Sequence, residues 1–77
     1  MSLSEAIKLT RQKALLSQEN FAGQLHVSLA SVARWESGRS IPNISAMKSI
    51  KVFCLENNLP FETIETEWLT SRMESKK

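Results

Sequence analysis

The sequence predicts an all-α fold built from five helices. Only two glycines and two prolines interrupt the 77 residues, so long stretches contain no residue that breaks a helix. Apolar side chains recur at spacings of three and four residues, which is the period of an amphipathic helix. Few stretches show the alternation of polar and apolar residues that a half-buried strand requires. The composition, 42% hydrophobic and 23% charged, is that of a globular chain rather than a disordered one.

The first helix is expected at about residues 4–14. Ser2 and Glu5 are three residues apart, as in a capping box, where each side chain satisfies a backbone N–H group of the other residue. Spacings of four, three and four residues then place four side chains on one inward face. These residues are Leu3, Ile7, Thr10 and Ala14.

The second and third helices are expected at about residues 17–25 and 28–37. Each begins at a serine, whose hydroxyl can accept a hydrogen bond from a free N–H group of the first turn. Only His26 and Val27 join the two helices, and so short a connection forces them to cross steeply. Gly38 suits the left-handed position that ends the third helix. The inward-facing residues are Phe21, Ala22, Leu25, Val32 and Trp35.

The outer face of the third helix differs from an ordinary solvated helix face. It comprises Ser28, Leu29, Ala30, Ala33 and Arg34. This face holds no Asp or Glu, and its small side chains would let the backbone come close to a partner surface. Arg34 is its single long cation. A guanidinium in this position can donate two hydrogen bonds to the O6 and N7 atoms of guanine.

The fourth helix is expected at about residues 44–57, because Pro42 disfavours helical geometry in the residue before it. Its inward stripe is predicted to be Ile44, Met47, Ile50, Phe53 and Cys54.

The fifth helix is expected at about residues 60–73, with Pro60 in its first turn. Its apolar stripe comprises Phe61, Ile64, Trp68 and Met73. Two alternatives remain for this stripe: it packs onto the other helices, or Phe61, Ile64 and Trp68 form a dimer surface.

The charge distribution favours the first half of the chain for contact with an anionic partner. The net charge is only +2. In residues 1–42 five Lys and Arg face three Glu, whereas residues 43–77 hold five of each sign. Glutamates repel phosphates, so phosphate contacts are expected from the first half.

Composition and motif content exclude several classes of protein. Cys54 is the single cysteine, so no internal disulfide can form, which fits a reducing compartment. The sequence shows no signal peptide and no apolar stretch of about 18 residues, so a cytoplasmic protein without a membrane partner is expected. His26 and Cys54 are too few for a metal site. No nucleophile and base are suitably spaced, so neither an enzyme nor a cofactor is expected.

A set of motifs extends from the first helix to the fourth. It consists of Arg11, the triplet Leu16-Ser17-Gln18, Phe21-Ala22, Val27-Ser28, Val32, Arg34-Trp35-Glu36, Gly38-Arg39 and Pro42. At these separations the sequence resembles the Cro/repressor-type helix-turn-helix proteins, also called the XRE family, over about residues 7–54. The resemblance implies one compact lambda-repressor-like domain over residues 1–77, with the helix-turn-helix at about residues 18–37.

The resemblance also implies roles for individual residues. Base edges would be read by Ser28, Leu29, Ala30 and Arg34. Phosphates would be contacted by Gln18, Arg39 and Ser40. Arg11 and Glu36 match a structural ion pair between the first helix and the end of the third. Leu15 and His26 stand where the family commonly has glycine; the turn at His26 needs a positive φ, which His tolerates better than most residues.

The function expected from these residues is that of a sequence-specific transcriptional regulator, a repressor, bound to double-stranded DNA. One copy offers few cations, so a homodimer on two half-sites about 34 Å apart is expected. The alternative is an antitoxin-type protein that binds a toxin through its fifth helix and tail and regulates its own operon. A third alternative is a helix-turn-helix scaffold that serves protein contacts only. No small-molecule ligand is expected.

Overall fold

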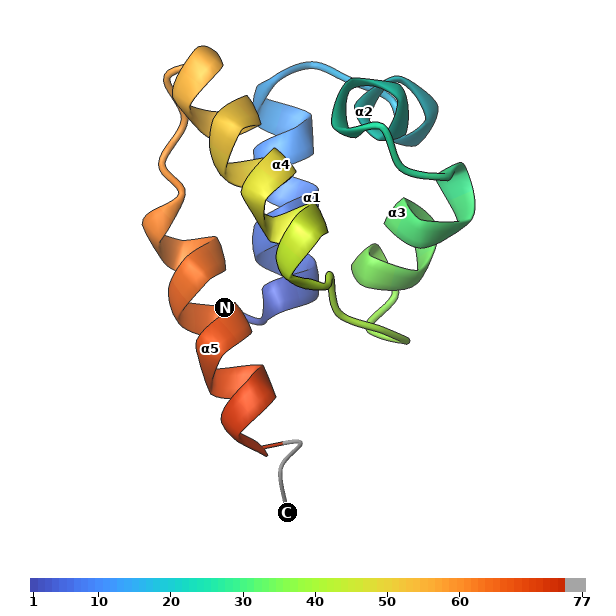
Figure 1. Ribbon diagram of the computed structural model, residues 1–77. Helices are drawn as coiled ribbons and strands as arrows, with labels where there is room; N and C mark the ends of the chain where they lie inside the picture. Colours follow the sequence, from blue (N-terminus) through green and yellow to red (C-terminus); the bar gives the residue numbers. More distant parts are fainter. Residues whose placement is uncertain (75–77) are drawn as a thin grey trace.

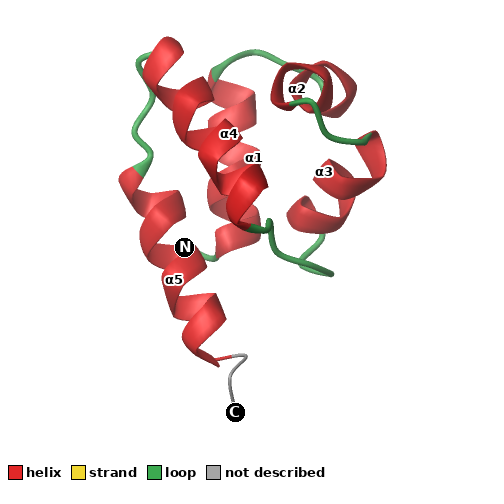
Figure 2. Cartoon of the chain, in the orientation of Figure 1, coloured by secondary structure: helices red, strands yellow, loops and turns green. Residues whose placement is uncertain are grey.

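A computed structural model describes the backbone of residues 1–74 and the side chains of residues 1–72. It contains α1 (Leu3–Lys13), α2 (Gln18–Leu25), α3 (Leu29–Glu36), α4 (Ile44–Glu56) and α5 (Glu62–Glu74). Within these residues there is no strand, which confirms the predicted all-α class (Figure 2). The predicted inward position of Met73 and the proposed role of the tail lie outside the described side chains.

The five helices surround one core. Helix α1 packs against α3 and α5, and α2 packs against α3 and α4. Figure 1 shows α3 and α5 on opposite sides of the molecule, with α1 and α4 between them. Each helix contributes a fully buried side chain: Ile7, Phe21, Val32, Ile50 and Ile64. The rings of Phe21 and Phe53 meet edge to face, with centroids 5.1 Å apart, and so join α2 to α4.

Four of the helices begin at a polar side chain that accepts a hydrogen bond from a backbone N–H group three residues later. Ser2, Ser17 and Ser28 accept at 3.1–3.2 Å, and Asn43 accepts at 2.8 Å. Each such cap contributes about 1 kcal/mol to helix stability. The Glu5 carboxylate also accepts from the Ser2 backbone at 3.0 Å, which lowers its pKa. The predicted capping box and the predicted starts at Ser17 and Ser28 are confirmed.

The same four helices end in one kind of turn. A residue with left-handed backbone follows each helix: Leu15, His26, Gly38 and Asn58, with φ of 61°, 59°, 78° and 55°. In each turn two backbone N–H groups donate back into the last helical turn, as in the Schellman motif. At His26 these bonds run from His26 to Gly23 at 3.3 Å and from Val27 to Ala22 at 3.0 Å. The positive φ predicted for Gly38 and His26 is confirmed.

Two predicted details are wrong. Ile44 is 55% exposed, and Ala46 takes its place among the buried residues of α4. At 3.6 residues per turn, Ile44 is rotated by about 120° from Ile50, the centre of the buried face, so it cannot share that face. Pro60 precedes α5 rather than lying in its first turn. The carbonyl of Phe61 accepts the first helical hydrogen bond, from Glu65 at 3.0 Å, so the helix begins two residues later than predicted.

The helices are short. The longest, α4 and α5, have 13 residues each, and no helix in the described part of the chain has both the length and the apolar character needed to span a bilayer.

Candidate nucleic-acid interface

The turn between α2 and α3 fixes the direction in which α3 leaves the core. His26 adopts the left-handed conformation, and Ser28 is extended with φ of −76° and ψ of 153°. The Ser28 hydroxyl accepts from the Ser31 N–H group at 3.1 Å and contacts the Ser31 hydroxyl at 3.0 Å. Val27 is half-buried against the core. The turn therefore has few free torsions, and α3 starts in a defined orientation.

Helix α3 has one face in the core and one in solvent. Val32 and Trp35 are 0% and 5% exposed. The opposite face presents the side chains for which the sequence predicted base contacts: Ser28, Leu29, Ala30 and Arg34, together with Ala33, are all exposed. Arg34 is not covered by α5, which lies on the other side of the molecule (Figure 1). Nothing in the described chain prevents a large partner from approaching this face.

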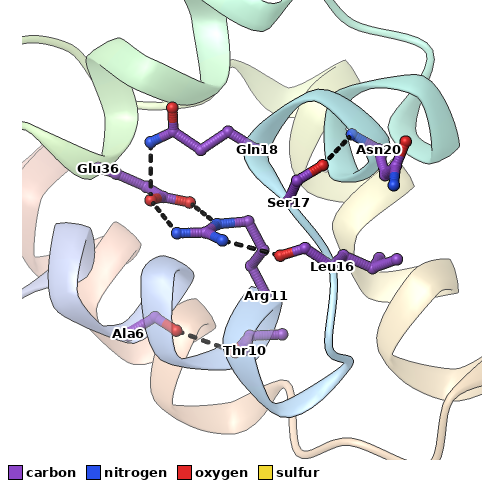
Figure 3. A network of polar contacts seen from close by, with 8 residues as sticks. All are labelled: Ala6, Thr10, Arg11, Leu16, Ser17, Gln18, Asn20 and Glu36. Atoms are coloured by element: carbon purple, nitrogen blue, oxygen red, sulfur yellow. Dashed lines mark hydrogen bonds and ion pairs between the residues drawn. The ribbon is translucent and has the colours of Figure 1, made fainter.

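A polar network holds the end of α3 against α1 and α2 (Figure 3). Arg11 donates from Nε to Glu36 Oε2 at 2.7 Å and from Nη2 to Glu36 Oε1 at 3.0 Å. Its Nη1 atom donates to the carbonyl oxygen of Leu16 at 2.8 Å. Gln18 Nε2 donates to Glu36 Oε1 at 3.0 Å. A single carboxylate thus joins α1, the start of α2 and the last residue of α3.

The network is largely buried, which removes a negative charge from the surface. The side chains of Arg11 and Glu36 are only 12% and 4% exposed. The Glu36 carboxylate raises the pKa of Arg11 above its ordinary value, because it bonds the charged guanidinium. Glu36 is the one acidic residue of α3. Because it points inward and is neutralised, the outer face of α3 is left with the charge of Arg34.

The three residues assigned to phosphate contact lie in different surroundings. Arg39 and Ser40 are both exposed in the loop that follows the left-handed turn at Gly38. Gln18 is half-buried, and its amide nitrogen is already bonded to Glu36. Gln18 therefore braces α3, and Glu19, exposed beside it, adds a negative charge to the first turn of α2. Arg39 and Ser40 are therefore more accessible to a phosphate than Gln18.

A contact that sequence reasoning missed fixes the loop carrying Arg39 and Ser40. The indole Nε1 atom of Trp68 donates to the carbonyl oxygen of Pro42 at 2.6 Å, and Pro42 is fully buried. Buried tryptophans generally need a partner for this N–H group. The sequence signals that need but does not say which of many carbonyls meets it. Through this bond α5 supports the loop beside α3.

Ile64 and Trp68 are 1% and 8% exposed and pack against the core. Of the two alternatives for the α5 stripe, the structure places these two residues within the monomer. Phe61 is only partly buried.

The described side chains also include potential metal ligands and one free thiol. Among the described residues no three His, Cys, Asp or Glu side chains gather where they could hold a metal ion. Cys54 is buried, and burial raises the pKa of its thiol to about 11, so at neutral pH it stays a neutral core side chain.

Comparison with known proteins agrees with this geometry. The family described as "Helix-turn-helix" matches residues 7–50. A protein named HTH-type transcriptional activator BcrR, from Enterococcus faecalis, is 38% identical over 53 residues. These residues make up 69% of this chain and 26% of that protein, so the chain spans about a quarter of the length of this relative. No solved structure matches the chain significantly. The match over residues 7–50 places the chain in the XRE-type helix-turn-helix family of DNA-binding transcription regulators.

Proposed function

We propose that the chain is a sequence-specific regulator that inserts the first half of α3 into the major groove and represses transcription by occupying its operator. One observation carries this proposal. The outer face of α3 presents Arg34 and small or apolar side chains, while the helix's one acid is turned inward and paired with Arg11. A helix with this face can approach a polyanion without an opposing charge.

The exposed side chains support a specific division of labour. Arg34 can donate two hydrogen bonds to a guanine, whereas Leu29 and Ala30 can pack only on a thymine methyl group. Ser28 already uses its hydroxyl to cap α3 and to contact Ser31, which limits what it can offer a base. Sequence preference should therefore depend most on Arg34. Arg39 and Ser40 would add contacts to phosphates, which carry no sequence information.

The proposal is tested by selecting bound sequences from a pool of random duplexes. With the unaltered chain we expect an enriched half-site containing a guanine, present in two inverted copies. Arg34→Ala should abolish the preference at that base pair, which corresponds to about 1–3 kcal/mol of discrimination. Arg39→Ala is the matched control, because it removes an exposed cation of the same type and should weaken binding to all sequences alike. An unchanged preference after Arg34→Ala would refute the assigned role of Arg34.

Repression is inferred because blocking a promoter requires only that the chain occupy DNA. The relative from Enterococcus faecalis is named an activator, but this chain spans 26% of it. A reporter with the selected sites placed across its promoter distinguishes the two outcomes. We expect lower expression with the unaltered chain and recovery with Arg34→Ala. Higher expression would show activation and would leave DNA recognition by α3 in place.

A further inference from the structure

The loop between α3 and α4 is held at its two ends, but its middle has little support from its own backbone. At the α3 end the N–H group of Arg39 donates to the carbonyl oxygen of Arg34 at 2.9 Å. At the α4 end the side chain of Asn43 caps the helix. No hydrogen bond within the loop joins residues 40–42, and among the described residues only α5 supplies one to them. The course of these residues therefore depends on α5.

Trp68 of α5 fixes this loop at Pro42. Its indole Nε1 atom donates to the Pro42 carbonyl oxygen at 2.6 Å, across a separation of 26 residues in the chain. A proline ring restricts its own φ to about −65°, and here the ring is also fully buried. The indole is 8% exposed, and the guanidinium of Arg72 lies 4.7 Å from the centroid of its ring. Both the ring and the carbonyl of Pro42 are therefore held in place.

The residues just before Pro42 are those for which phosphate contacts are proposed. Arg39 and Ser40 precede it by three and two residues, and both are exposed. A contact costs less free energy when the groups that make it are ordered before binding. Trp68 itself is buried on α5, on the opposite side of the molecule from α3, so it does not reach DNA that α3 binds (Figure 1). It can act on DNA binding only through the loop.

We propose that Trp68 is a positioning residue for DNA binding, because its bond to the Pro42 carbonyl orders the loop that presents Arg39 and Ser40 to the phosphates. The inference rests on the proposed function, which assigns those contacts. It gives α5, which lies outside the family match over residues 7–50, a part in the affinity for DNA. Phosphates carry no sequence information, so Trp68 should affect the strength of binding and not the sequence preference of α3.

Binding to a labelled duplex of random sequence, measured by fluorescence anisotropy, tests this role with Trp68→Phe, Arg39→Ala and the double variant. Arg39→Ala should weaken binding and lower the slope of log K against log salt concentration by about one. Trp68→Phe should weaken binding about threefold to tenfold, because the loop must then be ordered on the DNA. In the Arg39→Ala background Trp68→Phe should have a much smaller effect, since the cation that it positions is gone.

Two further proteins separate positioning from a general effect on folding. Ile64→Val trims a buried side chain of α5 and keeps the bond to Pro42, so it should lower the free energy of unfolding and leave DNA affinity unchanged. All measurements are made where urea denaturation shows each protein to be folded. If Trp68→Phe does not fold, a chemically synthesised chain with benzothiophene in place of the Trp68 indole removes the N–H group and keeps the ring size.

Three outcomes would overturn the role of Trp68 alone. The first is a Trp68→Phe variant that binds DNA as tightly as the unaltered chain. The second is an effect of Trp68→Phe that simply adds to that of Arg39→Ala, because Trp68 would then act independently of the loop cation. The third is an equal loss of affinity in Ile64→Val. Failure of the proposed function looks different: the unaltered chain would bind no duplex, or Arg39→Ala would change nothing, and either result refutes both ideas.

Discussion

The left-handed residues that end four helices carry unequal strain. Gly38 has no Cβ atom and adopts a positive φ freely, and Asn58 is among the residues that tolerate it. Leu15 gains nothing to offset its strain, because its side chain is 91% exposed. His26 is also exposed, yet it lies at the turn that sets the direction of α3. Leu15 is therefore the residue of the four whose left-handed conformation is least favoured and is not offset by side-chain packing.

Replacing Leu15 with glycine should stabilise the fold. The left-handed conformation costs a residue with a Cβ atom roughly 1–2 kcal/mol. Glycine would remove that strain but would lose about 0.4–1 kcal/mol through the greater freedom of the unfolded chain. The relief of strain is the larger effect, so the free energy of unfolding, measured by urea denaturation, should rise by about 0.5–1 kcal/mol. Leu15→Ala keeps the Cβ atom and should give no such gain. Equal effects of the two substitutions would show that φ is not the cause.

The conformation or burial of a single residue could be predicted from the sequence where the residues that determine it are its neighbours in the chain. The left-handed turns at His26 and Gly38 were predicted, because a turn's geometry is set by the few residues around it. The exposure of Ile44 was not predicted. Ile44 precedes Met47 by three residues, and this spacing alone does not show which side of the helix is buried. The buried face of α4 is determined by the helices that pack on it, and its centre could be located only once those helices were placed.

At the scale of a helix, the position of α3 depends on one buried carboxylate. Glu36 accepts three hydrogen bonds, two from Arg11 and one from Gln18. Removing one member of a buried ion pair leaves the other charge without its partner, and this commonly costs 3–5 kcal/mol. Replacing both members with apolar residues of similar volume avoids that penalty. The two substitutions should therefore be strongly non-additive.

We expect Arg11→Met and Glu36→Leu each to lower the free energy of unfolding by about 3 kcal/mol, and the double variant to lose much less than the sum. Urea denaturation of the four proteins gives the coupling energy. Gln18→Ala is the control, because it removes one hydrogen bond to the same carboxylate and should cost about 1 kcal/mol. If a single variant fails to fold, Glu36→Gln, which keeps the shape, supplies a milder comparison. Additive losses would mean that the pair is not coupled.

Helix boundaries were predictable where a capping side chain marks them. Ser2, Ser17 and Ser28 each accept the expected backbone hydrogen bond, so the first three helices begin where the sequence placed their caps. The start of α5 was missed because Pro60 is compatible with a first helical turn and also with the extended residue before one. The turn that ends α4 extends to Leu59, whose N–H group donates to the Cys54 carbonyl at 2.8 Å. Pro60 directly follows this turn and precedes α5.

At the scale of the whole molecule, the question is whether α5 belongs to the same cooperative unit as the helix-turn-helix. The family match ends at residue 50, before α5 begins. Yet α5 packs on α1, and Trp68 bonds the loop that leads from α3 to α4. The sequence left two alternatives for the apolar stripe of α5: packing onto the other helices or contact with a second copy. An amphipathic face is expected to be buried, but its pattern does not show which surface covers it. Burial of Ile64 and Trp68 beside residues from the other four helices favours one unit.

The two tryptophans can report on the two ends of this unit separately. Trp68→Phe leaves Trp35 as the reporter of α3, and Trp35→Phe leaves Trp68 as the reporter of α5; both indoles are buried, so each changes its fluorescence on unfolding. If residues 1–74 unfold together, each variant's fluorescence transition in urea should coincide with its own loss of helix signal in circular dichroism.

The urea midpoint of Trp68→Phe should be lower than that of Trp35→Phe, because Trp68→Phe also removes the hydrogen bond from the indole N–H group to the Pro42 carbonyl. A Trp68 signal that changes at lower urea than the helix signal would show that α5 detaches first. The helix-turn-helix would then remain folded without α5. The loop that carries Arg39 would be held by Trp68 only while α5 is packed against the other helices.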